Sequence, residues 1–357
     1  MRRLSIFLIL LLIFGCRATG AIEITGGKII DVVVADSGSS DSTFHTQLYE
    51  GWPVGPESFD IDEEGNIYVL DVLKILKFDR GGKWITTFKG ISKSGKYEGE
   101  SFWDIAVDNC GSIYVVKALR IMKFSPQGKF LLQTEDIPEY SNGGPSWVIG
   151  SNIEADKSGR IYNPHSRDGI VVYDQELKLK QVILMDAWHY SDVGIVQKDV
   201  SNDIYFRQNK YIFRTSLEEY SQSGKIDTAA VLPKEITNPR FLIKRTSERY
   251  PPPPNIFCPF IGFDKDSCFY FYKDEQWYGK KETRDICRRF SILKYKLERN
   301  RMNKFGEVVL DVPRDNEECS STGLHYSYKQ FIVTGDGTVY WLHGTVDTVK
   351  VSKIIID

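Results

Sequence analysis

The chain has 357 residues, with 46 Lys plus Arg against 48 Asp plus Glu and 41% hydrophobic residues, a composition that excludes a disordered or collagen-like protein. The formal net charge of -2 gives no long-range field that would gather polyanions, and the sequence has no basic stripe, so no nucleic-acid partner is expected. The aromatic content of 20 Phe, 19 Tyr and 7 Trp favours a large all-β body.

The chain begins with the layout of a secretory signal. A basic head, Met1-Arg2-Arg3, precedes an apolar run from Leu4 to Phe14, which is shorter than the ~20 residues needed to span a bilayer. The run ends in Gly15-Cys16, and this end resembles the lipobox of bacterial lipoproteins, whose Cys carries diacylglycerol and becomes the new N-terminus. The resemblance implies a signal peptide over 1–15, lipidation of Cys16 and a tether over 16–27.

This lipid anchor would place the protein in the cell envelope, at the outer membrane or the cell surface, without a spanning helix. The alternative is cleavage after Ala18-Thr19-Gly20, which would release a secreted or periplasmic protein that begins at Ala21.

One motif recurs along the body of the chain. Its clearest copies are Asp62-Glu-Glu-Gly-Asn-Ile-Tyr68, Asp108-Asn-Cys-Gly-Ser-Ile-Tyr114 and Asp156-Lys-Ser-Gly-Arg-Ile-Tyr162. Weaker copies end at Tyr205, Tyr270 and Tyr340, so the six tyrosines lie 46, 48, 43, 65 and 70 residues apart. Each copy predicts a hairpin with a tight turn, and the first two continue into a third and a fourth strand. Four antiparallel strands in about 45 residues are typical of a propeller blade.

The motif resembles the repeat of NHL-type β-propellers, which runs Asp-x-x-Gly-x-Ile-Tyr-Val and continues into an Ile-x-x-Phe strand. The resemblance implies an all-β fold over 28–357, a single six-bladed β-propeller of four-stranded antiparallel blades. Only one strand, Thr348 to Ile356, follows Tyr340, so we expect the N-terminal run over 28–35 to complete the last blade and close the ring. Residues from about 273 to 289 are expected to form an insertion in blade five.

Polar residues of the innermost strands alternate with apolar ones, and period-two alternation directs them toward the central channel. The candidates are Asp60, Asp104, Asn152 and Glu154. Carboxylates and amides are ligands that Ca²⁺ takes, and six-bladed lactonases of the gluconolactonase type hold a catalytic metal in this way. Blades five and six contribute apolar residues and Gly262 to the same columns, so a polar channel without metal or other cofactor is the favoured interpretation and Ca²⁺ the alternative.

Aromatic side chains near the blade starts predict a binding surface, because Trp and Tyr dominate interface hot spots. The candidates are Trp103, Trp147, Trp188, Trp277 and Tyr278; the alternative is that they cap the space between blades. No nucleophile elbow, P-loop or dinucleotide motif occurs, so no catalytic residue is assigned. Of the cysteines after Cys16, four lie in or near blade five, where export would permit disulfides, and Cys110 is the expected odd one.

The sequence therefore predicts a non-enzymatic, lipid-anchored propeller that serves as a platform for a protein or small-molecule ligand at the bacterial envelope. The alternative is a metal-dependent hydrolase of the lactonase type, or a lyase, with its site at the channel mouth. A third hypothesis is a structural part of a larger envelope assembly.

Overall fold

The structure is a computed structural model. It describes residues 27–49, 52–72, 74–89, 102–117, 120–134, 153–156, 158–165, 169–183, 197–198, 203–208, 210–237, 256–278, 286–310, 329–345 and 347–356. Residues 1–26, with the signal, Cys16 and nearly all of the tether, lie outside this part of the chain.

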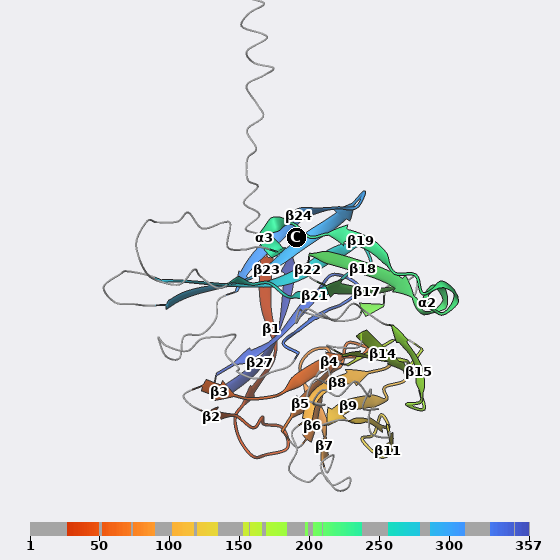
Figure 1. Cartoon of the computed structure of the whole chain (residues 1–357). Coiled ribbons are helices and arrows are strands. Elements are labelled where there is room, and N and C mark those ends of the chain that lie inside the picture. Colours follow the sequence, from red (N-terminus) through yellow and green to blue (C-terminus); the bar gives the residue numbers. More distant parts are fainter. Residues whose placement is uncertain are drawn as a thin grey trace, which may run out of the picture.

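Most described residues belong to antiparallel sheets of four strands, arranged like the blades of a propeller (Figure 1). Sheet I consists of β4 (Ser58–Ile61), β5 (Ile67–Asp71), β6 (Lys74–Phe78) and β7 (Trp84–Lys89). Sheet II consists of β8 (Phe102–Val107), β9 (Ile113–Lys117), β10 (Arg120–Phe124) and β11 (Phe130–Gln133). Sheet III consists of β12 (Glu154–Ala155), β13 (Ile161–His165), β14 (Gly169–Tyr173) and β15 (Leu179–Ile183). In each sheet the strands follow one another in chain order, which is the meander that a repeated hairpin produces.

The next strands form one continuous sheet with two halves. Sheet IV consists of β16 (Gln197–Lys198), β17 (Asp203–Gln208), β18 (Tyr211–Ser216) and β19 (Asp227–Val231). Sheet V consists of β21 (Phe260–Phe263), β22 (Cys268–Tyr278), β23 (Ile286–Glu298) and β24 (Arg301–Leu310), with β20 (Ile256–Phe257) also paired to β22. A single parallel pair, Val231 with Arg301, joins the halves, so each retains the four-stranded pattern of the other sheets.

Two short helices and one small hairpin accompany the sheets. The helices, α2 (Leu217–Ser223) and α3 (Lys234–Thr237), flank β19 in the chain. The hairpin pairs β2 (Gln47–Tyr49) with β3 (Trp52–Val54) ahead of sheet I. Neither helix of the described chain has the length and apolar character that crossing a bilayer requires.

The N-terminal strand completes the last sheet, as the sequence predicted. Sheet VI consists of β25 (Phe331–Val333), β26 (Val339–Gly344), β27 (Thr348–Ile356) and β1 (Gly27–Asp36), and β1 pairs with β27 from Gly27↔Ile356 to Asp36↔Thr348. Sheet I contacts this closing strand through Gly82, where an added Cβ would lie 1.7 Å from the carbonyl oxygen of Val32. Strand β1 is thus joined to sheet VI by backbone pairing and to sheet I by close packing.

Residues of the repeat motif form the hydrogen bonds that hold its tight turn. The Oδ1 atom of Asp62 accepts the backbone N–H of Asn66 at 2.8 Å, and the hydroxyl of Tyr68 donates to Oδ2 at 3.1 Å. Gly65 adopts φ +82°, which a residue with a side chain rarely takes. The tyrosine hydroxyls of sheets II, III and V donate to their repeat aspartates in the same way, at 2.8 to 3.0 Å.

Apolar clusters fill the spaces between successive sheets. Phe59 and Tyr340 belong to a cluster between sheets VI and I, and Tyr68 and Ile105 to one between sheets I and II. Further clusters lie between II and III, III and IV, IV and V, and V and VI. Of the aligned apolar residues three places before each repeat aspartate, those within the described residues enter these clusters; Val196 lies outside.

The segment expected as an insertion in blade five includes the extended ends of β22 and β23. These strands stay paired from Lys273↔Ser291 to Tyr278↔Ile286, and the hairpin reaches out past the neighbouring sheets (Figure 1). Cys268, among the cysteines expected to take part in disulfides there, is a buried free thiol, and Cys110 is an exposed one.

Candidate functional site

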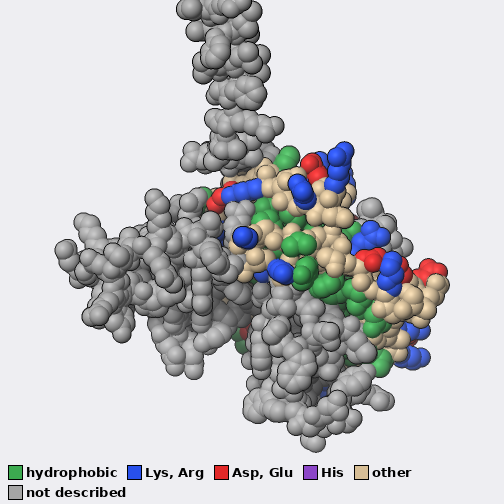
Figure 2. Space-filling model, turned by 45° about the horizontal axis from the view of Figure 1, so that its top comes forward, with side chains coloured by type: hydrophobic (Ala, Val, Ile, Leu, Met, Phe, Trp, Pro, Cys, Tyr) green, Lys and Arg blue, Asp and Glu red, His purple; other side chains and the backbone are tan. Residues whose placement is uncertain are grey.

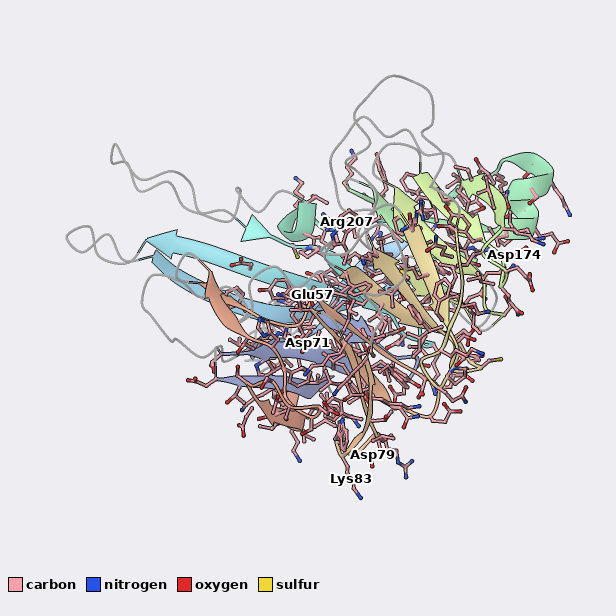
Figure 3. The ribbon with its side chains drawn as sticks, turned by 90° about the horizontal axis from the view of Figure 1, so that it is seen from below. Glu57, Asp71, Asp79, Lys83, Asp174 and Arg207 are labelled. Atoms are coloured by element: carbon pink, nitrogen blue, oxygen red, sulfur yellow. The ribbon has the colours of Figure 1, made fainter. Side chains whose placement is uncertain are left out.

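The two faces of the sheet assembly differ in their connections. Strands one and two of a sheet meet at tight turns such as 62–66, and strands three and four at turns such as 79–83. Because the strands are antiparallel, these turns share one face, which we call the turn face. The opposite face, which we call the loop face, is where first strands begin and where second and fourth strands end, so successive sheets are linked from this face; residues 90–101, 135–152, 184–196 and 311–328 lie between the described strand ends there in the sequence. Figure 3 shows this separation in sheet I, with Glu57 and Asp71 lying together and Asp79 and Lys83 at the far end.

Polar residues lie at or near the loop-face ends of most second strands, and in sheet V the strand β22 continues past this position to Tyr278. They lie three places after each repeat tyrosine, and they are Asp71, Lys117, His165, Gln208, Lys273 and His343. Side chains at this position share a side of the strand with residues that contact the preceding sheet, as Val69 does in sheet I and Val115 does in sheet II. Asp71, Lys117 and His343, which are 0%, 4% and 5% exposed, therefore close the apolar clusters at the loop face.

Glu57 and Asp71 form a pair of neighbouring carboxyl groups. Asp71 accepts the backbone N–H of His45 at 2.9 Å and of Val72 at 3.1 Å, and Lys74 Nζ lies 3.7 Å from it. The Oε2 atom of Glu57 is buried without a hydrogen-bond partner among the described residues. Burial, reinforced by the charge of Asp71, raises the pKa of Glu57 to about 8, so this carboxyl group is largely protonated at neutral pH.

Lys117 is a buried cation without an acidic or carbonyl partner among the described residues. Its Nζ atom is inaccessible to solvent and makes no hydrogen bond, and its contact is the ring of Phe102, whose centre lies 5.3 Å away. A cation–π contact contributes about 0.5–2 kcal/mol, whereas burying an unpaired ammonium costs several kcal/mol. The contact with Phe102 therefore offsets a small part of that cost.

His343 lies in a polar chain that crosses sheet VI. Its Nε2 is 2.7 Å from Ser352 Oγ, and Ser352 donates to Asp31 Oδ1 at 2.6 Å. Burial lowers the pKa of His343 to about 4, and its ring stacks on Trp341 with 3.7 Å between ring centres. The serine lies between the histidine and the carboxylate, so this arrangement is not that of a catalytic triad, in which the histidine is central.

A second buried group, the channel cluster of Asp60, Asp104, Glu154 and Lys329, joins innermost strands of different sheets. Asp60 accepts the N–H of Val107 and Asp104 accepts the N–H of Ile153, each at 2.7 Å, so each carboxylate binds the first strand of the next sheet. Ser58 also donates to Asp104.

Lys329 enters the channel cluster from the start of sheet VI. Its Nζ donates to the carbonyl oxygens of Ile105 and Ile153 at 3.0 Å and lies 3.5 Å from Asp104 and 3.4 Å from Glu154. Burial raises the pKa values of Asp60, Asp104 and Glu154, and Lys329 opposes this rise. The three carboxylates raise the pKa of Lys329 against its burial, which keeps its ammonium charged. This ammonium lies among the carboxyl groups at which the sequence suggested Ca²⁺.

The other candidates from the sequence are distributed as follows. Asn152, Trp147 and Trp188 lie outside the described residues. Trp103, in β8, is half-buried and packs against the cluster between sheets II and III. Trp277 and Tyr278 lie near the end of β22, paired with Cys287 and Ile286. Within the described part of the chain, no group of three or more His, Cys, Asp or Glu side chains could hold a metal ion.

Lys117 and Lys329 were missed by sequence reasoning. Lys117 stands in a visible column of polar residues, so alignment of the repeats three places after the tyrosine would have found it. Lys329 lies five places before Thr334, at the parity of the apolar residue Phe331, and alternation alone directs it away from the channel.

The outer strands carry exposed apolar side chains. In sheets IV and V these are Val231, Phe305 and Val309. Figure 2 shows one face of the molecule, on which hydrophobic side chains are bordered by lysines and arginines. These residues add an apolar component to the outer surface.

No family model matches the chain, and no curated protein matches it. Among solved structures, it is similar to the extracellular domain of a protein described as a hybrid two-component system of B. thetaiotaomicron, with TM-score 0.44 and 11% identity over 91% of this chain and 38% of that one. The chain thus spans less than half the length of that domain. It is also similar to a chain of the mitotic checkpoint complex, with TM-score 0.44, 8% identity and coverages of 92% and 95%. A protein of unknown function from Bacteroides caccae gives TM-score 0.42, 12% identity and coverages of 74% and 88%. At these values the similarities carry no functional inference.

Proposed function

We propose that this chain is an exported, lipid-anchored, six-bladed propeller whose loop face binds a protein or small-molecule ligand at the bacterial cell envelope. The observation that carries the binding role is the asymmetry of the faces. Most described connections on the turn face are tight turns, such as 62–66 and 79–83, and helix α2 in sheet IV is the exception; at the loop face, successive sheets are linked by longer stretches of sequence, and buried polar groups close the apolar clusters. Binding residues concentrate on long loops that a rigid scaffold positions.

Six blades are supported by the packing between the sheets, and the NHL type is proposed from the repeat motif alone. Each of the sheets I to VI shares an apolar cluster with the next, and sheet VI shares one with sheet I. This succession is what a closed ring of six blades requires. The bond between the repeat aspartate and tyrosine gives the motif a structural reason in each sheet where it is described.

A non-enzymatic role is proposed because the channel cluster serves a structural purpose. Its carboxylates accept backbone N–H groups of adjacent sheets, and Lys329 supplies their counter-charge. These carboxylates are therefore already engaged, and the geometry favours binding over the lactonase-like or lyase alternative.

Envelope anchoring is proposed from the first sixteen residues. Mass spectrometry of the mature N-terminus tests it: a diacylglyceryl Cys16 is expected, and a protein that begins at Ala21 would be secreted or periplasmic instead.

The binding role is tested by mapping a bound ligand. A ligand found by thermal-shift screening of the purified mature protein is expected to slow amide hydrogen exchange at the loop face, around Glu57 and Phe102. Protection confined to turns 62–66 and 79–83, or a screen of envelope proteins and metabolites without any ligand, would contradict the proposal.

Matched tryptophan variants refine this test. Trp277→Ala is expected to leave the melting temperature nearly unchanged and to weaken ligand capture about tenfold or more, because aromatic anchors dominate binding surfaces. Trp84→Ala is the control, since Trp84 is 42% exposed and follows a turn on the opposite face. Equal effects of the two changes would exclude Trp277 from the binding surface.

A further inference from the structure

Lys117 closes the apolar cluster between sheets I and II at the loop face. It is the last residue of β9 and pairs with Phe102 and Arg120 on the two neighbouring strands. Its side chain shares the side of the strand that Ile113 and Val115 present to sheet I. With 4% of the residue exposed, the ammonium group is held between two sheets and away from bulk water.

The two buried lysines, Lys329 and Lys117, have different polar surroundings. Lys329 has two carbonyl oxygens at 3.0 Å and two carboxylates within 3.5 Å. In the described part of the chain, the Nζ atom of Lys117 makes no hydrogen bond, and it faces the ring of Phe102. Buried ammonium groups are stable in proteins when an anion or several oxygen acceptors surround them. The surroundings of Lys117 therefore lack the oxygen atoms that those of Lys329 provide.

The equivalent positions of other sheets show that the chain can supply such partners. Asp71 receives two backbone N–H groups and the nearby charge of Lys74, and His343 bonds with Ser352. Lys117 differs from both, because its three N–H donors and its positive charge have no such partner among the described residues. The complementary chemistry is an anionic oxygen group, which a carboxylate or a phosphate supplies.

We propose that Lys117 anchors an anion-binding subsite on the loop face, between sheets I and II, which receives a carboxylate or phosphate group of the ligand. The inference rests on the proposed binding role of this face and adds the charge of the ligand. The Phe102 ring centre lies 5.3 Å from the ammonium, and the buried N–H groups make no hydrogen bond in the structure.

The test uses the purified mature protein with sodium phosphate and sodium acetate as separate probes, and sodium chloride at equal ionic strength as the reference. One of the two probes is expected to raise the melting temperature saturably by about 2 °C or more, because an anion that binds the folded state stabilises it. Phosphate alone identifies a phosphate group and acetate alone a carboxylate, whereas equal responses to all three salts overturn the proposal.

Variants connect the response to Lys117. Lys117→Met is expected to abolish the probe's effect and to melt above the wild type in chloride, since it removes an unpaired buried charge. Lys77→Met is the matched control, because Lys77 also lies over an aromatic ring, that of Tyr68 at 4.7 Å, but is half-buried, and it is expected to keep the response. If Lys117→Met does not fold, Lys117→Gln serves the same comparison. An undiminished response in the Lys117 variant would overturn the proposal.

Failure of this inference differs from failure of the proposed function. A ligand that protects the loop face equally in wild type and Lys117→Met would leave the binding role intact and remove the anion subsite. A ligand that protects the turn face would remove the binding role, while the response to phosphate or acetate would still decide whether Lys117 binds an anion.

Discussion

At the scale of single residues, the repeat aspartate holds its turn and its tyrosine together. Asp108 accepts the N–H groups of Cys110 at 2.9 Å and Ser112 at 2.8 Å through one oxygen and the hydroxyl of Tyr114 at 3.0 Å through the other, with 5% of the residue exposed. A carboxylate that binds several buried donors leaves all of them unsatisfied when it is removed.

Asp108→Ala is therefore expected to lower the free energy of unfolding by about 3 kcal/mol, and Tyr114→Phe by about 1 kcal/mol. Chemical denaturation measures both. Asp336→Ala is the control, since Asp336 accepts Thr334 Oγ1 and the N–H of Thr338 at an exposed turn and should contribute below about 1 kcal/mol. Equal losses in Asp108→Ala and Asp336→Ala would show that the buried repeat aspartate stabilises the fold no more than an exposed turn aspartate does.

Glu57 makes stability depend on pH. Its pKa rises from 4.5 to about 8 on folding because of burial and the charge of Asp71. Between these values the folded state holds a proton that the unfolded state releases, so this contribution to stability is complete below about pH 4.5 and is lost as the pH rises through 8.

Glu57→Gln, which is neutral at every pH, should remove this loss and stabilise the protein by about 2 kcal/mol at pH 9, allowing for the solvent that reaches part of the side chain. Melting temperatures between pH 4 and pH 9 measure the difference, with Glu64→Gln at an exposed turn position as the control. Parallel pH profiles of wild type and Glu57→Gln would contradict the assignment.

At the scale of elements, two contacts fix the closing strand β1: its pairing with β27 and the close approach of Gly82 to Val32. The sequence predicts the first contact but not the second. The pairing of β1 with β27 follows from counting strands, because Thr348 to Ile356 left the last blade without its outer member. The approach of Gly82 to Val32 does not follow, because the φ of +85° at Gly82 is by itself a sufficient local reason for a glycine. Contacts between elements far apart in the chain require the closed ring, which no local pattern contains.

Alanine substitutions at Gly65 and Gly82 separate the cost of a positive φ from the cost of a close contact with β1. Gly65 and Gly82 have φ values of +82° and +85°, but a Cβ on Gly65 would meet Arg80 Cβ at 3.2 Å, whereas on Gly82 it would lie 1.7 Å from a backbone oxygen of β1. Gly65→Ala should cost about 1–2 kcal/mol from the left-handed conformation. Gly82→Ala should cost roughly 2 kcal/mol more, because β1 must shift. Urea denaturation of both variants measures the difference, and equal losses would mean that β1 moves aside freely.

At the scale of the whole molecule, the repeats predicted the sheets and the sides of their strands, but not the group at the centre. Alternation grouped Asp60, Asp104 and Glu154 because each lies in the first strand of its sheet. Lys329 precedes its strand, so its backbone is outside the rule, and its long side chain reaches the carbonyls of Ile105 and Ile153 in other sheets. The polar residues three places after each repeat tyrosine form a column that alignment reveals, but the alignment does not show that Asp71, Lys117 and His343 are buried there.

Lys329 should therefore stabilise the assembly across its channel. Lys329→Met leaves buried carboxylates without their counter-charge, and breaking a buried ion pair in this way costs about 3–5 kcal/mol. The loss should shrink at acidic pH, where protonation neutralises Asp104 and Glu154, whose pKa values burial has already raised.

The double variant Lys329→Met, Glu154→Gln should recover part of this stability, because an amide at position 154 needs no counter-charge. Millimolar Ca²⁺ should raise the melting temperature of Lys329→Met more than that of the wild type, since the ammonium no longer occupies the space among the carboxylates. Denaturation with and without Ca²⁺, with EDTA as the reference, measures all of these effects. A wild-type protein that loses stability in EDTA as much as Lys329→Met does would show that a metal, and not Lys329 alone, balances the channel carboxylates.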